Sequence, residues 1–250
     1  MNNPKISIIT STFNSERYVE QCIQSVLNQN YDNLEYIIID GGSSDGTVSI
    51  IEKYIDKIAY FVSEPDRGIS DAFNKGISVA TGDIVGIINS DDFMMPNVLE
   101  RVADEYEESY DVFRGYQTIY YPNRNTYKVE SPNNKFSMPP FGNVLCHEAA
   151  FVTKKMYDKV GAYKVDFKYI MDLDLFVRMS KLGARHKFIN VGVLIFRSGG
   201  VSSMINSECI KERRRLVIEN GGSWFDAFIY VTYHRIKSFV KKIVFIANPK

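Results

Sequence analysis

Residues 84–92 read Ile84-Val85-Gly86-Ile87-Ile88-Asn89-Ser90-Asp91-Asp92, an aliphatic run that is interrupted only by a glycine and that ends in a polar turn with two adjacent acids. A short, β-branched run without polar alternation is typical of a strand buried on both faces of a parallel sheet. The stretch therefore predicts such a strand over residues 84–88, with the two acids just beyond its carboxyl end.

Similar runs precede this strand in the chain, at residues 6–10, 36–39 and 60–62. The segments between them carry apolar residues at helical spacing and predict helices over residues 19–27, 47–54 and 71–80, and a further helix that starts at Pro96. Strands that alternate with helices are typical of right-handed βαβ units. We therefore expect an α/β fold with a Rossmann-like, mostly parallel central sheet flanked by helices.

Polar residues follow each predicted strand, in the segments 10–14, 40–45, 64–68 and 89–92. Ligands of open parallel sheets bind beyond the carboxyl ends of the strands. Because these ends lie along one edge of the sheet, we expect the four segments to meet there and to form the binding site.

The second half of the chain has a less regular pattern. It predicts strands over residues 110–121 and 188–196, a proline-rich connection over residues 131–143 and a helix over residues 172–182. Residues 224–246 mix apolar and basic residues at roughly helical spacing. We expect one domain over residues 1–222, followed by an amphipathic, basic C-terminal helical extension over residues 223–250.

The bulk composition argues against several classes of protein. The 250 residues include 30 basic and 30 acidic ones, so no overall positive charge favours binding to nucleic acid. The three cysteines are far apart and form no Cys-x-x-Cys pair, which argues against a disulfide framework and a thiolate zinc site. The start of the chain has no signal-peptide pattern, and no apolar stretch is long enough to span a membrane. We therefore expect a cytoplasmic protein.

The acids Asp91 and Asp92 allow two interpretations. Adjacent carboxylates repel each other unless a cation lies beside them, and Mg²⁺ and Mn²⁺ both prefer oxygen ligands. Alternatively, residues 89–92 form a turn in which Asp92 caps the helix that follows. On these residues alone, a metal site and a capping turn are equally good interpretations.

The other candidates also have ordinary structural explanations when each is taken alone. Asp40 can accept a hydrogen bond from a nucleotide base or ribose, or it can cap the turn that follows it. Asp71 and Lys75 are four residues apart and can pair on one helix face. Asp172 fits a helix N-cap, and a lone His147 more often packs than binds a ligand.

Three stretches follow one another in the chain: ITSTFN at residues 9–14, IIIDGGSSDGT at residues 37–47 and EPDRGISDAFNKGISVATGDIVGIINSDD at residues 64–92. In this order they resemble the family 2 glycosyltransferases, which have the GT-A fold, and in particular the bacterial members that build O-antigen, capsule and other exopolysaccharides. The resemblance extends over about residues 4–200. It implies an inverting transferase that moves a sugar from a nucleotide-sugar, with UDP as the nucleotide, to a hydroxyl of a glycan acceptor linked to a polyprenyl lipid.

The resemblance also implies roles for single residues. Asn89-Ser90-Asp91 occupies the place of the family's Asp-x-Asp motif and departs from it at Asn89, so Asp91, supported by Asp92, would bind a divalent cation, Mn²⁺ or Mg²⁺, at the donor diphosphate. Asp172 aligns with the family's catalytic base. His147 would lie near the donor sugar or the acceptor, and Glu148 replaces the family's glutamine there. The residues implied in nucleotide binding are Thr10, Phe13, Asp40, Asp66, Asp71, Asn74, Lys75, Ser90 and Asp91.

The same residues also bear on other functions. The turn after the first strand, residues 10–14, carries neither GxGxxG nor GxxxxGK[ST], which excludes dinucleotide-binding and P-loop enzymes. A non-catalytic sugar-nucleotide-binding member of the same fold stays an alternative. The tail over residues 223–250 either packs as a terminal helix or lies on an anionic bilayer as a peripheral membrane contact. The sequence favours neither a monomer nor a homodimer.

Overall fold

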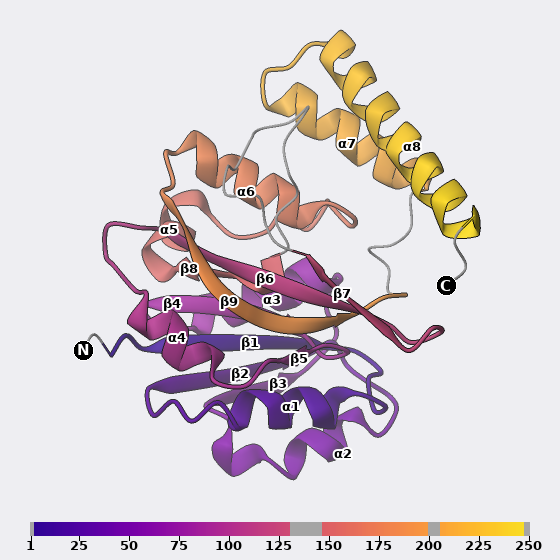
Figure 1. Cartoon of the computed structure of the whole chain (residues 1–250). Coiled ribbons are helices and arrows are strands. Elements are labelled where there is room, and N and C mark those ends of the chain that lie inside the picture. The colour runs from indigo at the N-terminus through magenta and orange to yellow at the C-terminus, as the bar shows by residue number, and fades with distance from the viewer. Residues whose placement is uncertain (1–2, 131–146, 200–205, 248–250) are drawn as a thin grey trace.

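The computed structural model describes residues 3–130, 147–199 and 206–247, with side chains up to residue 236. A nine-stranded sheet forms its centre, in the order β3-β2-β1-β4-β8-β6-β9-β5, and β7 pairs with β6 outside this path (Figure 1). The strands are β1 (Ile6–Thr12), β2 (Leu34–Asp40), β3 (Tyr60–Ser63), β4 (Ile84–Asn89), β5 (Phe93–Met94), β6 (Val112–Tyr121), β7 (Thr126–Glu130), β8 (Ala150–Thr153) and β9 (His186–Arg197).

Helices cover both faces of this sheet. They are α1 (Val19–Leu27), α2 (Thr47–Glu52), α3 (Ile69–Val79), α4 (Val98–Asp104), α5 (Lys154–Val160), α6 (Met171–Lys181), α7 (Ser207–Glu219) and α8 (Trp224–Ala247), with the short 3₁₀ turns η1 (Ile55–Lys57) and η2 (His147–Ala149). Within the described ranges, no helix combines the length and the apolar character needed to cross a membrane.

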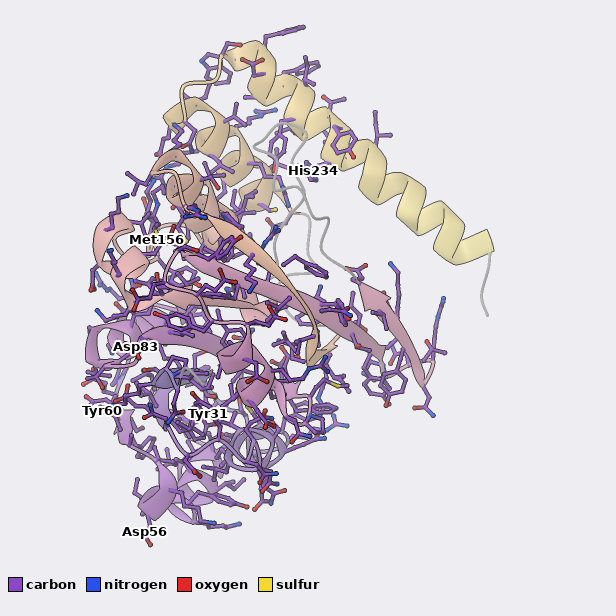
Figure 2. The ribbon with its side chains drawn as sticks, turned by 60° about the vertical axis from the view of Figure 1, so that its left-hand side comes forward. Tyr31, Asp56, Tyr60, Asp83, Met156 and His234 are labelled. Carbon is purple, nitrogen blue, oxygen red and sulfur yellow. The ribbon has the colours of Figure 1, made fainter. Side chains whose placement is uncertain are left out.

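The first half of the sheet is wholly parallel, which confirms the predicted α/β fold. Its register places Thr12 beside Asp40 and Ser11 beside Asn89, so the predicted polar segments do meet along one edge. Figure 2 labels Tyr60, the first residue of β3, and Asp83, which precedes β4, and both lie at the opposite edge. The carboxyl ends of the parallel strands therefore form a common rim.

The second half of the sheet is mixed. β8 pairs antiparallel with both β4 and β6, β6 pairs parallel with β9, and β9 pairs antiparallel with the short strand β5. Because β5 directly follows the polar turn after β4, this pairing brings the end of β9, at Arg197, back to the rim.

Two layers of apolar side chains enclose the sheet. Alternate residues of β1 point to opposite faces: Ile8 packs in the layer with α1, α2 and α4, and Ile9 packs in the layer with α3, α5 and α6. A third cluster joins α6 to α7 and α8 through buried residues that include Phe167, Leu216 and Tyr230.

One predicted helix start is wrong. Helix α4 begins at Val98 rather than at Pro96. The residue between them, Asn97, has a left-handed backbone with a φ of 57°, so the chain turns once more before it becomes helical. The predicted proline-rich connection over residues 131–143 lies outside the described residues.

Candidate functional site

The turn after β4 is closed by a hydrogen bond from the Asp92 backbone N–H to the Asn89 carbonyl, at 3.1 Å. Arg197 holds this turn from the end of β9. Its backbone N–H donates to Asp92 Oδ1 at 2.8 Å, and its Nε donates to the Asp91 carbonyl at 2.6 Å. The guanidinium lies 4.5 Å from the centre of the Tyr18 ring, which packs it in place.

Two further polar side chains approach this turn from η2. Glu148 is buried, and its Oε1 accepts a hydrogen bond from Asn89 Nδ2. His147 Nε2 lies 3.6 Å from the same oxygen. The carboxyl groups of Glu148 and Asp92 are also in hydrogen-bonding contact. Three acids, Asp91, Asp92 and Glu148, are therefore gathered at one point of the rim.

The electrostatics of these acids are unusual for carboxylates. Burial, together with the neighbouring Glu148 and Asp91, raises the pKa of Asp92 to about 10. Burial, and to a smaller extent Glu148, also raises the pKa of Asp91. Carboxylates in such surroundings need a proton or a cation to offset their repulsion.

The oxygen atoms of the turn fit a divalent cation. Asp92 Oδ2 and Asn89 Oδ1 are buried and accept no hydrogen bond from the residues that the structure describes. The same residues contain no group of three or more His, Cys, Asp or Glu side chains that could hold a metal alone. Mg²⁺ often takes only one or two carboxylates and completes its shell with water and substrate phosphates. Asp91 and Asp92 match that donor set.

The predicted base, Asp172, lies in the first turn of α6 and is half-buried. Burial raises the pKa of its carboxyl, and the charge of His147 partly offsets this. Burial lowers the pKa of His147, but Glu148 and Asp172 outweigh it, so the pKa of His147 is raised overall. Its Nδ1 lies 3.5 Å from the Tyr163 hydroxyl. His147 is thus buried close to two acids, Glu148 and Asp172.

Asp40 holds the loop that follows β2. Its Oδ2 accepts hydrogen bonds from the backbone N–H groups of Gly42 and Ser43, at 3.1 and 2.8 Å, and from Ser63 Oγ at 2.7 Å. These are the turn contacts that the sequence offered as the alternative for this residue. A contact of Asp40 with the nucleotide base stays a prediction.

The loop after β3 lies against the loop after β2. A Cβ atom at Gly41 would lie 2.6 Å from Asp66 Oδ2, so a larger residue there would displace the Asp66 carboxylate. Further along, Asp71 pairs with Arg67 at 2.9 Å, and Lys75 pairs with Glu64 at 2.8 Å. A role of these side chains in nucleotide binding stays a prediction.

Asn74 and Thr10 have structural partners instead. The Asn74 amide exchanges two hydrogen bonds with the Tyr163 backbone, each 2.8 Å long, and so ties α3 to the segment before α6. Thr10 is fully buried, and its hydroxyl lies 3.1 Å from the Tyr36 hydroxyl. Thr10 therefore points into the core below the rim, because it lies on the same face of β1 as Ile6 and Ile8.

Phe13 and Ser90 do lie at the rim. Phe13 is 61% exposed just beyond β1, so its ring is free to meet a flat ligand. Ser90 Oγ lies 2.8 Å from Ser15 Oγ and links the loops after β4 and β1. The sequence interpretation gave no role to Glu148 or Arg197, and no local pattern around either residue marks its contact with the turn.

Comparisons with known proteins bear on the family and the fold of the chain. The model of glycosyl transferase family 2 matches residues 7–161. The chain is 25% identical to a chondroitin synthase of Escherichia coli over 189 aligned residues. The aligned region covers 72% of this chain and 27% of the synthase, so the chain spans about a quarter of that protein. It resembles the structure of S. aureus TarS 1–349 in complex with UDP-GlcNAc, with a TM-score of 0.69 and 19% identity over 86% of this chain and 66% of that one.

A second solved structure has the same fold. It is a mannosyltransferase, PcManGT from Pyrobaculum calidifontis, in complex with GDP-Man and Mn²⁺, with a TM-score of 0.62 and 18% identity over 91% of this chain and 70% of that one. At these identities the two structures support the GT-A fold of the chain. With the family match over more than half of its length, the chain belongs to glycosyl transferase family 2.

Proposed function

We propose that the chain is an inverting, metal-dependent glycosyltransferase that moves a sugar from a UDP-sugar to a hydroxyl of a glycan acceptor. The observation that carries the proposal is that acids suited to hold a cation and an acid suited to act as a base lie at one rim. Asp92 and Asn89 each offer a buried oxygen that accepts no hydrogen bond from the described residues, and the Asp91 carboxyl adjoins them. Asp172 lies within electrostatic reach of the His147–Glu148 pair beside this turn.

The chemistry assigns different tasks to these acids. A divalent cation at Asp91 and Asp92 would neutralise the charge that develops on the leaving diphosphate. Asp172 takes the proton of the acceptor hydroxyl as its oxygen attacks the anomeric carbon from the opposite side. The bond from that carbon to the diphosphate oxygen breaks as the new glycosidic bond forms, so the anomeric configuration inverts. A base with a raised pKa is suited to accept this proton.

The nucleotide would lie across the loops after β1, β2 and β3. Phe13 supplies an exposed ring for the base, while Asp66, Asp71 and Lys75 supply polar contacts. The TarS structure holds UDP-GlcNAc and the mannosyltransferase structure holds GDP-Man. We favour UDP, which the sequence resemblance also implies.

The acceptor would be a bacterial surface polysaccharide, such as an O-antigen or capsule chain, carried by a polyprenyl lipid. Two features support it: the similarity to a chondroitin synthase, and the exposed aromatic residues Trp224, Phe225 and Phe228 at the start of α8. The extension over residues 223–250 would then hold the enzyme at the membrane surface that presents the acceptor.

Asp172→Asn tests the assignment of the base. We expect the variant to bind UDP as the wild type does but to lower kcat for transfer from its preferred UDP-sugar by about 10²–10⁴-fold, because a general base contributes about that much. Asp158→Asn, an exposed acid on α5, is the matched control.

Product analysis would distinguish the alternatives. An inverted anomeric linkage supports the mechanism, and unchanged kcat in the Asp172→Asn variant would rule out this base. A wild-type chain that binds UDP-sugars tightly, yet transfers and hydrolyses none of them, would favour the non-catalytic sugar-nucleotide-binding member.

A further inference from the structure

An amide and a carboxylate from distant parts of the chain meet beside Asp91 and Asp92. Asn89 ends β4, Glu148 lies in η2 59 residues later, and Asn89 Nδ2 donates to Glu148 Oε1. The contact thus joins one amide and one carboxylate next to the two acids of the turn.

The contacts around Glu148 fix the direction of its carboxylate. Asn89 and His147 hold Oε1 from two sides, with His147 Nε2 at 3.6 Å. The same carboxyl group also contacts Asp92. Glu148 is only 5% exposed, so water cannot screen its charge from the two acids.

At this position the charge of Glu148 has one basic neighbour, His147, and two acidic ones, Asp91 and Asp92. Glutamine has nearly the same shape and could exchange hydrogen bonds with Asn89 without a charge. A third buried carboxylate beside two others costs several kcal/mol unless a positive partner offsets it. That cost is compensated when a divalent cation occupies the oxygens of Asp91 and Asp92.

We propose that Glu148 is a positioning residue of the donor site, whose carboxylate, aimed by Asn89 and His147, supplies the negative charge that residue 89 lacks and so sets the cation affinity of Asp91 and Asp92. The inference rests on the proposed function, because it concerns the cation of the same donor site. It gives Glu148 no direct bond to the metal.

Exchanging the two side chains tests the inference. Glu148→Gln removes the charge and leaves two amides in contact. Asn89→Asp in the wild-type background places two carboxylates against each other. The double variant Asn89→Asp/Glu148→Gln restores one carboxylate and one amide in the reversed order. Glu105→Gln, whose acid pairs with Lys187 at the surface, is the matched control.

The first measurement is the Mn²⁺ affinity of each variant in the presence of UDP, by titration calorimetry. We expect Glu148→Gln to weaken Mn²⁺ binding by about tenfold or more, and the double variant to recover most of that loss, as coupled neighbouring residues do. The control should match the wild type. Unchanged Mn²⁺ affinity in Glu148→Gln, or a double variant no better than Glu148→Gln, would overturn the inference.

The second measurement is thermal unfolding in EDTA, which distinguishes a positioning role of Glu148 from a purely structural one. In metal-free Glu148→Gln, the lost repulsion with Asp91 and Asp92 should offset the lost pairing with His147, so we expect a Tm close to that of the wild type. A lower Tm with unchanged Mn²⁺ affinity would make Glu148 a structural residue only. A wild-type chain without any Mn²⁺-dependent UDP binding would contradict the proposed function itself, and the inference with it.

Discussion

Glu35, at the start of β2, is a nearly buried carboxylate at the opposite end of the strands from the candidate site. It accepts hydrogen bonds from Lys5 Nζ and Ser7 Oγ, both at 2.6 Å, and from the Thr81 backbone N–H at 2.7 Å. Burial raises the pKa of Glu35, but these hydrogen bonds outweigh it and lower the pKa to about 2. One side chain thus joins β1, β2 and the turn before β4.

Its ionisation predicts a pH dependence of stability. The pKa of Glu35 falls from its ordinary value of 4.5, which applies to the unfolded chain, to about 2 in the folded chain. The stabilisation by the ionised carboxylate is therefore complete above pH 4.5 and is lost as the pH falls towards 2. We expect Glu35→Gln to lower the free energy of unfolding by about 1–3 kcal/mol at neutral pH. Urea unfolding at about pH 7 and pH 3 should show a smaller deficit at the lower pH. An equal deficit at both would show that the charge of Glu35 is not involved.

A site residue could be predicted from the sequence where its immediate neighbours in the chain marked it. Asp91 and Asp92 were found because they adjoin each other at the end of an apolar run. Arg197 was missed because it reaches Asp92 from 105 residues away, through the pairing of β9 with β5. Thr10 was expected at the rim, but its hydroxyl is buried against Tyr36 on the same face of β1 as Ile8. The positions of the other site residues depend on strand register and long-range contacts, which no local pattern encodes.

At the scale of elements, α3 packs unusually close to β1. A Cβ atom at Gly76 would lie 2.4 Å from Ile9 Cγ2, so the helix approaches the strand at its glycine. Helix propensity alone favours Gly76→Ala by about 0.8–1.0 kcal/mol, whereas overpacking in a core costs about 1–3 kcal/mol.

We therefore expect Gly76→Ala to destabilise the protein. Ser78→Ala, on the exposed side of the same helix, is the control and should keep or slightly raise the stability. The free energies of unfolding of both variants in urea give the comparison. A Gly76→Ala variant more stable than the wild type would contradict the close packing of α3 on β1.

The elements that could be predicted were those with a strong pattern of their own. Strands β1 to β4 read as apolar runs, and α1, α3 and α6 bury a stripe of regularly spaced residues. Helix α7 was not predicted, because it is rich in charged residues and buries little besides Cys209, Leu216 and Val217. The short strands β5 and β8 have only two and four residues, too few for a period to be recognised.

At the scale of the whole molecule, α8 lies at the outer side of the structure, next to α7 (Figure 1). Its Ala227 and Tyr230 are buried in the cluster shared with α6 and α7, so its first turns belong to the packed structure. Its other face exposes large apolar side chains at Trp224, Phe225 and Phe228, which are 74%, 69% and 61% exposed. An apolar patch of this kind marks an interaction surface.

The proposed membrane contact predicts a specific loss. The triple variant Trp224→Ser/Phe225→Ser/Phe228→Ser keeps the buried residues of α8, so we expect it to fold and to bind UDP normally, yet to lose at least about tenfold in affinity for vesicles containing phosphatidylglycerol. Tyr127→Ser, which removes an exposed aromatic residue from β7, is the control. Equal vesicle binding by the triple variant and the wild type would exclude α8 as the membrane contact.

A calorimetric titration with UDP, GDP and dTDP, each with Mn²⁺ and with EDTA, on the wild type and Asp91→Ala tests the donor site directly. We expect that UDP binds in the presence of Mn²⁺, that EDTA weakens this binding, and that Asp91→Ala abolishes the effect of the metal while the variant stays folded. Binding of UDP that is equally tight with Mn²⁺ and with EDTA, or that survives unchanged in Asp91→Ala, would contradict the assignment of Asp91 and Asp92 to a cation at the donor diphosphate.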